Sequence, residues 1–97
     1  MKISEVTVQN MTDYLRLDDA SEIETAEVTA FMTAAKNYII GYTGLTVEEL
    51  DEHEDLTVAY QVLVADYFDN RNFQTDKPTY VNRTVQSILS LYRVNLL

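Results

Sequence analysis

Cysteine is absent from this chain of 97 residues, which also has only two glycines, one proline, one histidine and no tryptophan. Without cysteine there is no disulfide framework, no thiolate nucleophile and no cysteine metal site. The scarcity of glycine and proline leaves little turn chemistry for β-hairpins and favours helices. Neither glycine lies in a strand-to-helix turn, so we expect no phosphate-binding loop. These absences predict a helical protein without thiol or nucleotide chemistry.

Basic residues are also scarce, and the acidic residues are unevenly distributed. The formal net charge is −9. Residues 1–55 carry thirteen acids against three bases, whereas residues 56–97 carry three acids against four bases. A nucleic-acid-binding protein needs a basic stripe that displaces counterions from phosphates, and half of this chain has the opposite sign. We therefore expect no specific nucleic-acid binding.

Long uncharged stretches are missing as well. No run of the sequence approaches membrane-spanning length, and residues 1–5 contain no basic segment followed by an apolar run. We therefore expect neither secretion nor binding to a membrane.

Candidate catalytic and metal-binding residues are few. A Ser, Thr or Cys nucleophile needs a neighbouring base, and the one histidine, His53, lies within the acidic run 51–55. We interpret His53 as an exposed residue in a charged connection. The acidic stretch 48–55 lacks the alternating carboxylates and the turn glycine of a calcium loop, so we interpret it as a solvated face. The sequence predicts no enzyme, no cofactor and no metal site.

What the chain does contain is a core. Hydrophobic residues make up 46% of a sequence that is long enough for one compact domain, which we place at residues 1–97. Apolar periodicity and cap residues predict a short helix over residues 8–16, capped by Thr7, and a longer one that starts after Ser21. The longer helix should end at Thr43 and Gly44, where glycine suits a left-handed cap.

Two further helices are predicted in the second half. After a single turn that starts with the capping box of residues 46–49, Asp55 should cap a third helix that closes at residues 70–72. A loop over residues 73–81 should follow, and Asn82 should cap a last helix with Arg93 in its final turn.

The predicted fold class is therefore all-α: a small four-helix domain, with two longer, antiparallel core helices and two short covering helices. The overlap of three apolar stripes predicts a set of mostly buried residues, namely Tyr38, Ile39, Leu63, Tyr67, Phe68, Ile88 and Leu89.

Four segments, in order along the chain, resemble the head-tail connector family of tailed phages. They are Tyr14-Leu15-Arg16-Leu17-Asp18-Asp19, Ala34-Ala35-Lys36-Asn37-Tyr38-Ile39-Ile40-Gly41-Tyr42-Thr43-Gly44, Asp66-Tyr67-Phe68-Asp69-Asn70-Arg71 and Val85-Gln86-Ser87-Ile88-Leu89-Ser90-Leu91-Tyr92-Arg93. The resemblance implies a head-completion adaptor, also described as a DNA-packaging protein, whose location is the virion neck and, during assembly, the host cytoplasm.

The same resemblance implies the partners. The chain would form a homo-oligomeric ring of about twelve copies on the portal protein. It would then receive a downstream neck or tail-completion protein. The candidate interface residues are Arg71, Arg93, Tyr80, Leu96 and Leu97. For the two arginines a structural role, in which they bond helix-end carbonyls or a carboxylate such as Asp66 or Asp69, competes with the interface role.

One alternative is an acidic helical binding protein that mimics DNA or inhibits a partner, with carboxylates in place of phosphates. Such a mimic should carry acids over most of its surface, but residues 56–97 are nearly neutral. Gene order would distinguish the connector hypothesis from this alternative, because a connector gene should follow the portal and capsid genes.

Overall fold

The computed structural model describes residues 1–70 and 83–93 of the chain. In these ranges the chain forms helices and no strand, which confirms the all-α prediction. The predicted loop at residues 73–81, the predicted cap Asn82 and residues 94–97 lie outside the described residues. The elements are η1 (Ile3–Glu5), α1 (Val8–Tyr14), α2 (Glu22–Thr43), α3 (Val47–Leu50), α4 (Glu54–Asp69) and α5 (Arg83–Ser90).

Local capping chemistry sets both ends of α2. The Ser21 hydroxyl accepts a hydrogen bond from the Glu24 amide at 3.1 Å, and the Glu24 carboxylate accepts one from the Ser21 amide at 3.0 Å. At the other end Gly44 takes a left-handed conformation, with φ of 76°, and donates to the Ile40 carbonyl. The predicted start and end of this helix are confirmed.

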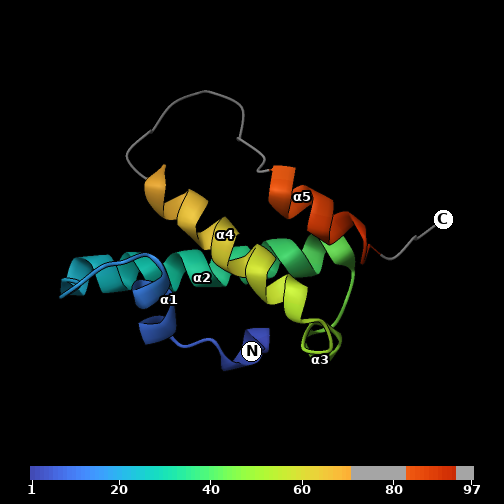
Figure 1. Cartoon of the computed structure of the whole chain (residues 1–97), viewed down its shortest axis with the longest axis horizontal. Helices are drawn as coiled ribbons and strands as arrows, with labels where there is room; N and C mark the ends of the chain where they lie inside the picture. The colour runs from blue at the N-terminus through green and yellow to red at the C-terminus, as the bar shows by residue number, and fades with distance from the viewer. Residues whose placement is uncertain (71–82, 94–97) are drawn as a thin grey trace.

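The two longest helices, α2 and α4, run in roughly opposite directions and cross at the centre of the molecule (Figure 1). Phe31 of α2 lies against Tyr67 and Phe68 of α4, with ring centroids 6.0 and 6.5 Å apart. Helix α5 covers both long helices, and α1 packs on α2. This is the predicted arrangement of two longer core helices with shorter covering helices. Among the described residues, no helix is both long and apolar enough to span a bilayer.

Most of the predicted core is buried. Ile39, Leu63, Phe68 and Leu89 are buried, and three further predicted residues are only half-buried at the edge of the core: Tyr38, Tyr67 and Ile88. The tyrosines lie at the edge because a phenol keeps its hydroxyl near water while its ring packs.

A short N-terminal segment also belongs to the core, which the helix periodicity did not predict. Ile3 of η1 is completely buried, Val6 is nearly so, and η1 packs on α4. The Thr57 hydroxyl of α4 donates to the Met1 carbonyl at 2.7 Å. The first six residues therefore form part of the folded domain.

Three predicted helix boundaries are wrong. Helix α1 ends at Tyr14, not at residue 16, because Arg16 adopts a left-handed φ of 59° and the Leu17 amide turns back to the Thr12 carbonyl. Helix α4 begins at Glu54 with His53 at its N-cap position, so that Asp55 lies inside the first turn.

The third boundary is the end of the last helix. Helix α5 ends at Ser90, and the next two amides make tighter bonds, from Leu91 to the Ile88 carbonyl and from Tyr92 to the Leu89 carbonyl. Arg93 therefore lies beyond the helix and not in its final turn.

Candidate interaction surface

Of the five candidate interface residues, the structure describes Arg93, while Arg71, Tyr80, Leu96 and Leu97 lie outside the described residues. The Arg93 guanidinium carbon lies 5.3 Å from the centroid of the Tyr42 ring at the end of α2. Tyr42 in turn stacks on Tyr38, at 6.1 Å with an interplanar angle of 19°. In the described part of the chain Arg93 forms no ion pair, so it bonds neither Asp66 nor Asp69. Its exposed charge is available to a partner.

The residue before Arg93 fixes the direction of the chain after α5. The Tyr92 hydroxyl donates to the Asp55 carboxylate, at 2.6 Å to Oδ2 and 2.8 Å to Oδ1, and its ring centroid lies 4.3 Å from that of His53. The hydrogen bond to the carboxylate, with burial and the negative charge of Asp55, raises the pKa of Tyr92. Tyr92 therefore ties the end of α5 to the first turn of α4.

The environment of His53 differs from the prediction of an exposed residue in a charged connection. His53 is half-buried, at the N-cap position of α4, with its ring against Tyr92. The two rings pack together at an interplanar angle of 35°, so His53 covers part of the Tyr92 ring.

The carboxylates around His53 are mostly exposed, in agreement with the interpretation of a solvated face, and some of them also join separate segments of the fold. Asp51 accepts hydrogen bonds from the Ser4 amide at 3.0 Å and the Ser4 hydroxyl at 2.6 Å, which tie η1 to the turn after α3. The N-terminal amine lies 3.5 Å from Glu54, and Asp55 binds Tyr92. Among the described residues, no group of three or more His, Asp or Glu side chains is arranged to hold a metal ion.

Removal of the Tyr92 hydroxyl should loosen α5. We expect Tyr92→Phe to lower the melting temperature, because the Asp55 carboxylate then loses a charge-assisted hydrogen bond. Amide hydrogen exchange should rise in α5 more than in α2. The measurements are thermal unfolding and hydrogen exchange at neutral pH.

Tyr60→Phe is the matched control for that substitution. Tyr60 is completely buried, its hydroxyl has no hydrogen-bond partner in the described part of the chain, and burial raises its pKa to about 12. Loss of this hydroxyl removes an unsatisfied polar group, so the melting temperature should stay the same or rise. An equal decrease in melting temperature in Tyr92→Phe and Tyr60→Phe would contradict the role given to the Tyr92 hydroxyl.

The Ser4–Asp51 pair should make stability depend on acid pH. Hydrogen bonds from Ser4 lower the pKa of Asp51 from its ordinary value of 3.8, and hydrogen bonds from Thr46 lower the pKa of Glu49 from 4.5. A lowered pKa in the folded state stabilises the protein above the unfolded-state value, and this stabilisation disappears as the pH falls through the folded-state value. We expect melting temperatures to fall below about pH 4.5, as linkage requires.

Asp51→Asn tests this dependence in a series of melts from pH 7 to pH 2. The variant should melt below the wild type at pH 7, and the difference in melting temperature should shrink as the pH falls through the lowered folded-state pKa of Asp51. Glu52→Gln is the control, since Glu52 is exposed and its side chain makes no hydrogen bond within the described residues. A difference that stays constant with pH would contradict the proposed linkage.

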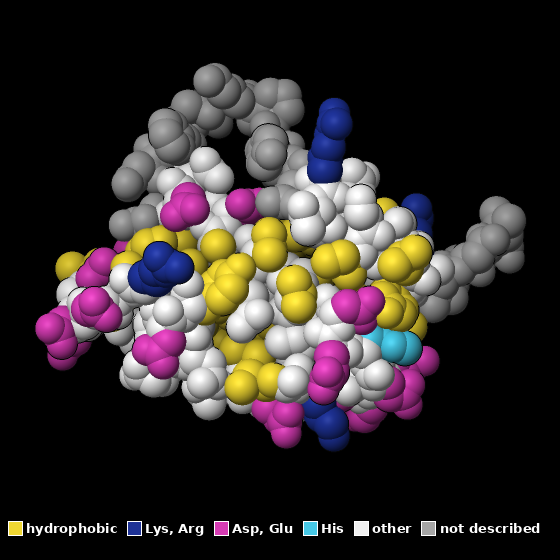
Figure 2. Space-filling view, in the orientation of Figure 1, with side chains coloured by type: hydrophobic (Ala, Val, Ile, Leu, Met, Phe, Trp, Pro, Cys, Tyr) yellow, Lys and Arg dark blue, Asp and Glu magenta, His cyan; other side chains and the backbone are white. Residues whose placement is uncertain are grey.

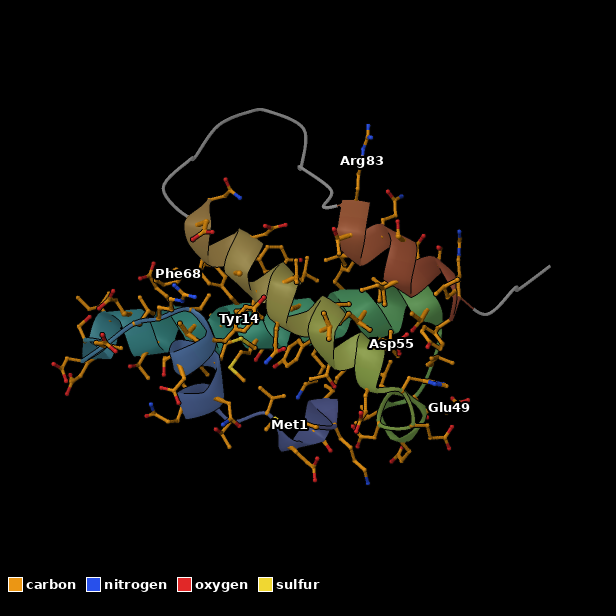
Figure 3. All side chains as sticks on the ribbon, in the orientation of Figure 1. Met1, Tyr14, Glu49, Asp55, Phe68 and Arg83 are labelled. Carbon is orange, nitrogen blue, oxygen red and sulfur yellow. The ribbon has the colours of Figure 1, made fainter. Side chains whose placement is uncertain are left out.

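Acidic side chains lie at both sides and along the lower edge of the face in Figure 2, and hydrophobic side chains gather across its middle. Residues 83–93 carry Arg83 and Arg93 and no acid, and the labelled Arg83 side chain points away from the helices (Figure 3). Residues 1–70 carry fifteen acids and three bases. Within residues 1–70 and 83–93, the two most exposed large hydrophobic residues are Ile23, in the first turn of α2, and Leu91, after α5, each at 75% exposure.

The family-like position of Arg93 in the sequence marked it as a candidate, but the sequence did not predict the long-range hydrogen bonds that organise this part of the fold. The Tyr92–Asp55 bond joins residues 37 positions apart, and the Ser4–Asp51 bond joins residues 47 apart. The periodicity within one helix does not predict a hydrogen bond between residues so far apart in the sequence.

The chain matches no protein-family model, no curated protein and no solved structure.

Proposed function

We propose that this chain is a structural subunit of the phage neck, which forms a ring between portal and tail and completes the DNA-filled head. The observation that carries the proposal is where the family-like segments lie in the fold. Three of them lie at the C-terminal ends of helices. Residues 14–19 begin at the last residue of α1, and residues 34–44 and 66–70 contain the last turns of α2 and α4. The fourth, at 85–93, covers α5 and the turn after it.

The chemistry of the surface supports an assembling protein. An exposed isoleucine and an exposed leucine lie at different ends of the molecule, and one segment of net positive charge lies on an acidic body. Such a division suits contacts with proteins, where opposite charges steer association and apolar side chains give affinity. The partners we propose are other copies of the chain, the portal protein and a downstream neck or tail-completion protein.

The acidic surface also suits a ring through which DNA must pass. Carboxylates repel phosphates, so a ring lined with them would not retain the DNA that moves through it. We propose the virion neck as the location of the mature protein and the host cytoplasm as the place of its assembly.

Inactivation of the gene in the phage or prophage that encodes it tests this function. We expect DNA-filled heads that bear no tails and lose their DNA, and we expect the wild-type gene supplied in trans to restore infectious particles. Electron microscopy and nuclease sensitivity of the packaged DNA are the measurements. Normal yields of tailed, infectious particles without the gene would contradict the proposal.

A further inference from the structure

We infer that copies of this chain join head to tail, so that the edge formed by Arg83, Leu91 and Arg93 in one copy docks on the first turn of α2, around Glu22 and Ile23, in the next. We call the first surface the basic edge and the second the acidic end. The place of this contact in a phage neck rests on the proposed function, but the contact itself is argued from the two surfaces.

The basic edge is held in a defined shape by the residues beside it. The side chain of Tyr92 is bound inward by Asp55, and the residues on either side, Leu91 and Arg93, are exposed. Leu91 is 75% exposed, and no acid lies between residues 83 and 93. Leu91 lies between Arg83 and Arg93 in the sequence, and an exposed leucine on a segment that carries cations and no acid has the chemistry of a surface that binds an acidic partner.

The acidic end has the complementary chemistry. Ile23 is 75% exposed and follows Asp18, Asp19 and Glu22 in the sequence. The capping box of α2 uses Glu24, and no hydrogen bond within the described residues engages the other three side chains. Their charges are not needed to close the helix, so a cationic partner can pair with them without opening the cap.

The positions of the two surfaces exclude a contact between them within one copy. Arg93 lies over Tyr42 near the C-terminal end of α2, while the acidic end is at its N-terminus. A helix of 22 residues is about 33 Å long, so the two surfaces of one copy cannot meet each other. Opposite charges pair only where the basic edge of one copy meets the acidic end of another. A two-fold dimer forms that pair twice and closes at two copies, whereas a head-to-tail contact leaves one surface of each copy free and generates rings or open helices.

The absence of cysteine from the chain allows a direct cross-linking test with the full-length protein. Ile23→Cys and Leu91→Cys are made separately and together, each variant is shown to melt like the wild type, and the thiols are oxidised over a series of protein concentrations. We expect the double variant to form a ladder of covalent oligomers. A mixture of the two single variants should give several-fold more of the mixed dimer than of either homodimer.

Three further experiments test whether the cross-links depend on the proposed contact: a control cysteine, a salt series and a charge reversal. Val58→Cys, on an exposed position of α4, should cross-link only at the background level. High salt should reduce the mixed dimer, because the contact pairs exposed charges. Charge reversal in Arg83→Glu with Arg93→Glu should abolish the ladder, and addition of a partner with Asp18→Lys and Glu22→Lys should restore it.

The inference is overturned if the mixed dimer and the homodimers form in statistical proportion, if the double variant stops at a closed covalent dimer, or if no variant exceeds the Val58→Cys background at the highest concentration. These outcomes are separable from failure of the proposed function. Head-to-tail cross-links in a protein that is absent from the phage neck would refute the function and leave the contact standing, whereas a neck protein without these cross-links would refute the contact alone.

Discussion

Replacement of Leu63 by alanine should lower the free energy of unfolding by about 2–5 kcal/mol. Leu63 is only 7% exposed and lies on α4, in the core that this helix shares with α2 and α5. Loss of its side-chain methyls removes hydrophobic transfer energy and leaves a cavity that close-packed neighbours fill only in part. Since a domain of this size is stabilised by about 5–15 kcal/mol, the loss is a large fraction of the total. Urea unfolding followed by circular dichroism measures it.

The control for Leu63 is another residue of the same helix. Val58 is 49% exposed, so Val58→Ala should change the free energy of unfolding by no more than about 0.5 kcal/mol. If Leu63→Ala and Val58→Ala lowered the free energy of unfolding by comparable amounts, the packing face of α4 would be wrongly identified.

The second large effect should come from the N-terminal segment. Ile3→Ala should cost about 2–5 kcal/mol, as for other fully buried isoleucines, because Ile3 is completely buried between η1 and α4. Hydrogen bonds from Ser4 to Asp51 and from Thr57 to Met1 hold the backbone of the segment in place, so the neighbouring residues have little freedom to fill the space. Thermal and urea unfolding give the change in stability.

The same substitution at an exposed site gives the comparison. Ile23→Ala, at a side chain that is 75% exposed, should leave the free energy of unfolding almost unchanged. If Ile3→Ala were equally harmless, residues 1–6 would not belong to the folded domain, and the Ser4–Asp51 pair would have no role in acid stability.

The long helices could be predicted because their signals are local. Ser21, Glu24 and Gly44 specify the ends of α2 through hydrogen bonds that span only three or four residues, and the apolar stripe between them repeats with the helical period. The capping box at residues 46–49 predicted α3 for the same reason, with Thr46 and Glu49 exchanging hydrogen bonds.

The remaining features depend on tertiary contacts. A turn as short as η1 has no periodicity, so only its packing on α4 reveals that Ile3 is buried. Tyr92 continues the apolar stripe of α5 in the sequence. For this reason the periodicity predicted a helix that runs past Ser90, where α5 ends. In the structure Tyr92 stays on the inner side because Asp55 and His53 hold it, although the helix has already ended at Ser90.

The candidate interface was likewise predicted only in part, because some of its features depend on tertiary contacts. The sequence selected Arg93 as a candidate interface residue through its family-like position, and the uneven charge of the chain agreed with an interface role. It could not identify Leu91 or Ile23 as the exposed apolar residues, because exposure depends on which neighbouring helices cover each face.

An electron cryo-microscopy reconstruction of particles made by the virus or prophage that encodes this chain tests most directly whether the chain builds the neck of a phage particle. We expect a ring of identical helical subunits between portal and tail, with α2, α4 and α5 fitting the density of each subunit and the basic edge of one copy facing the acidic end of the next. A chain that is found in the capsid shell or the tail tube, or that is missing from the particles, would contradict it.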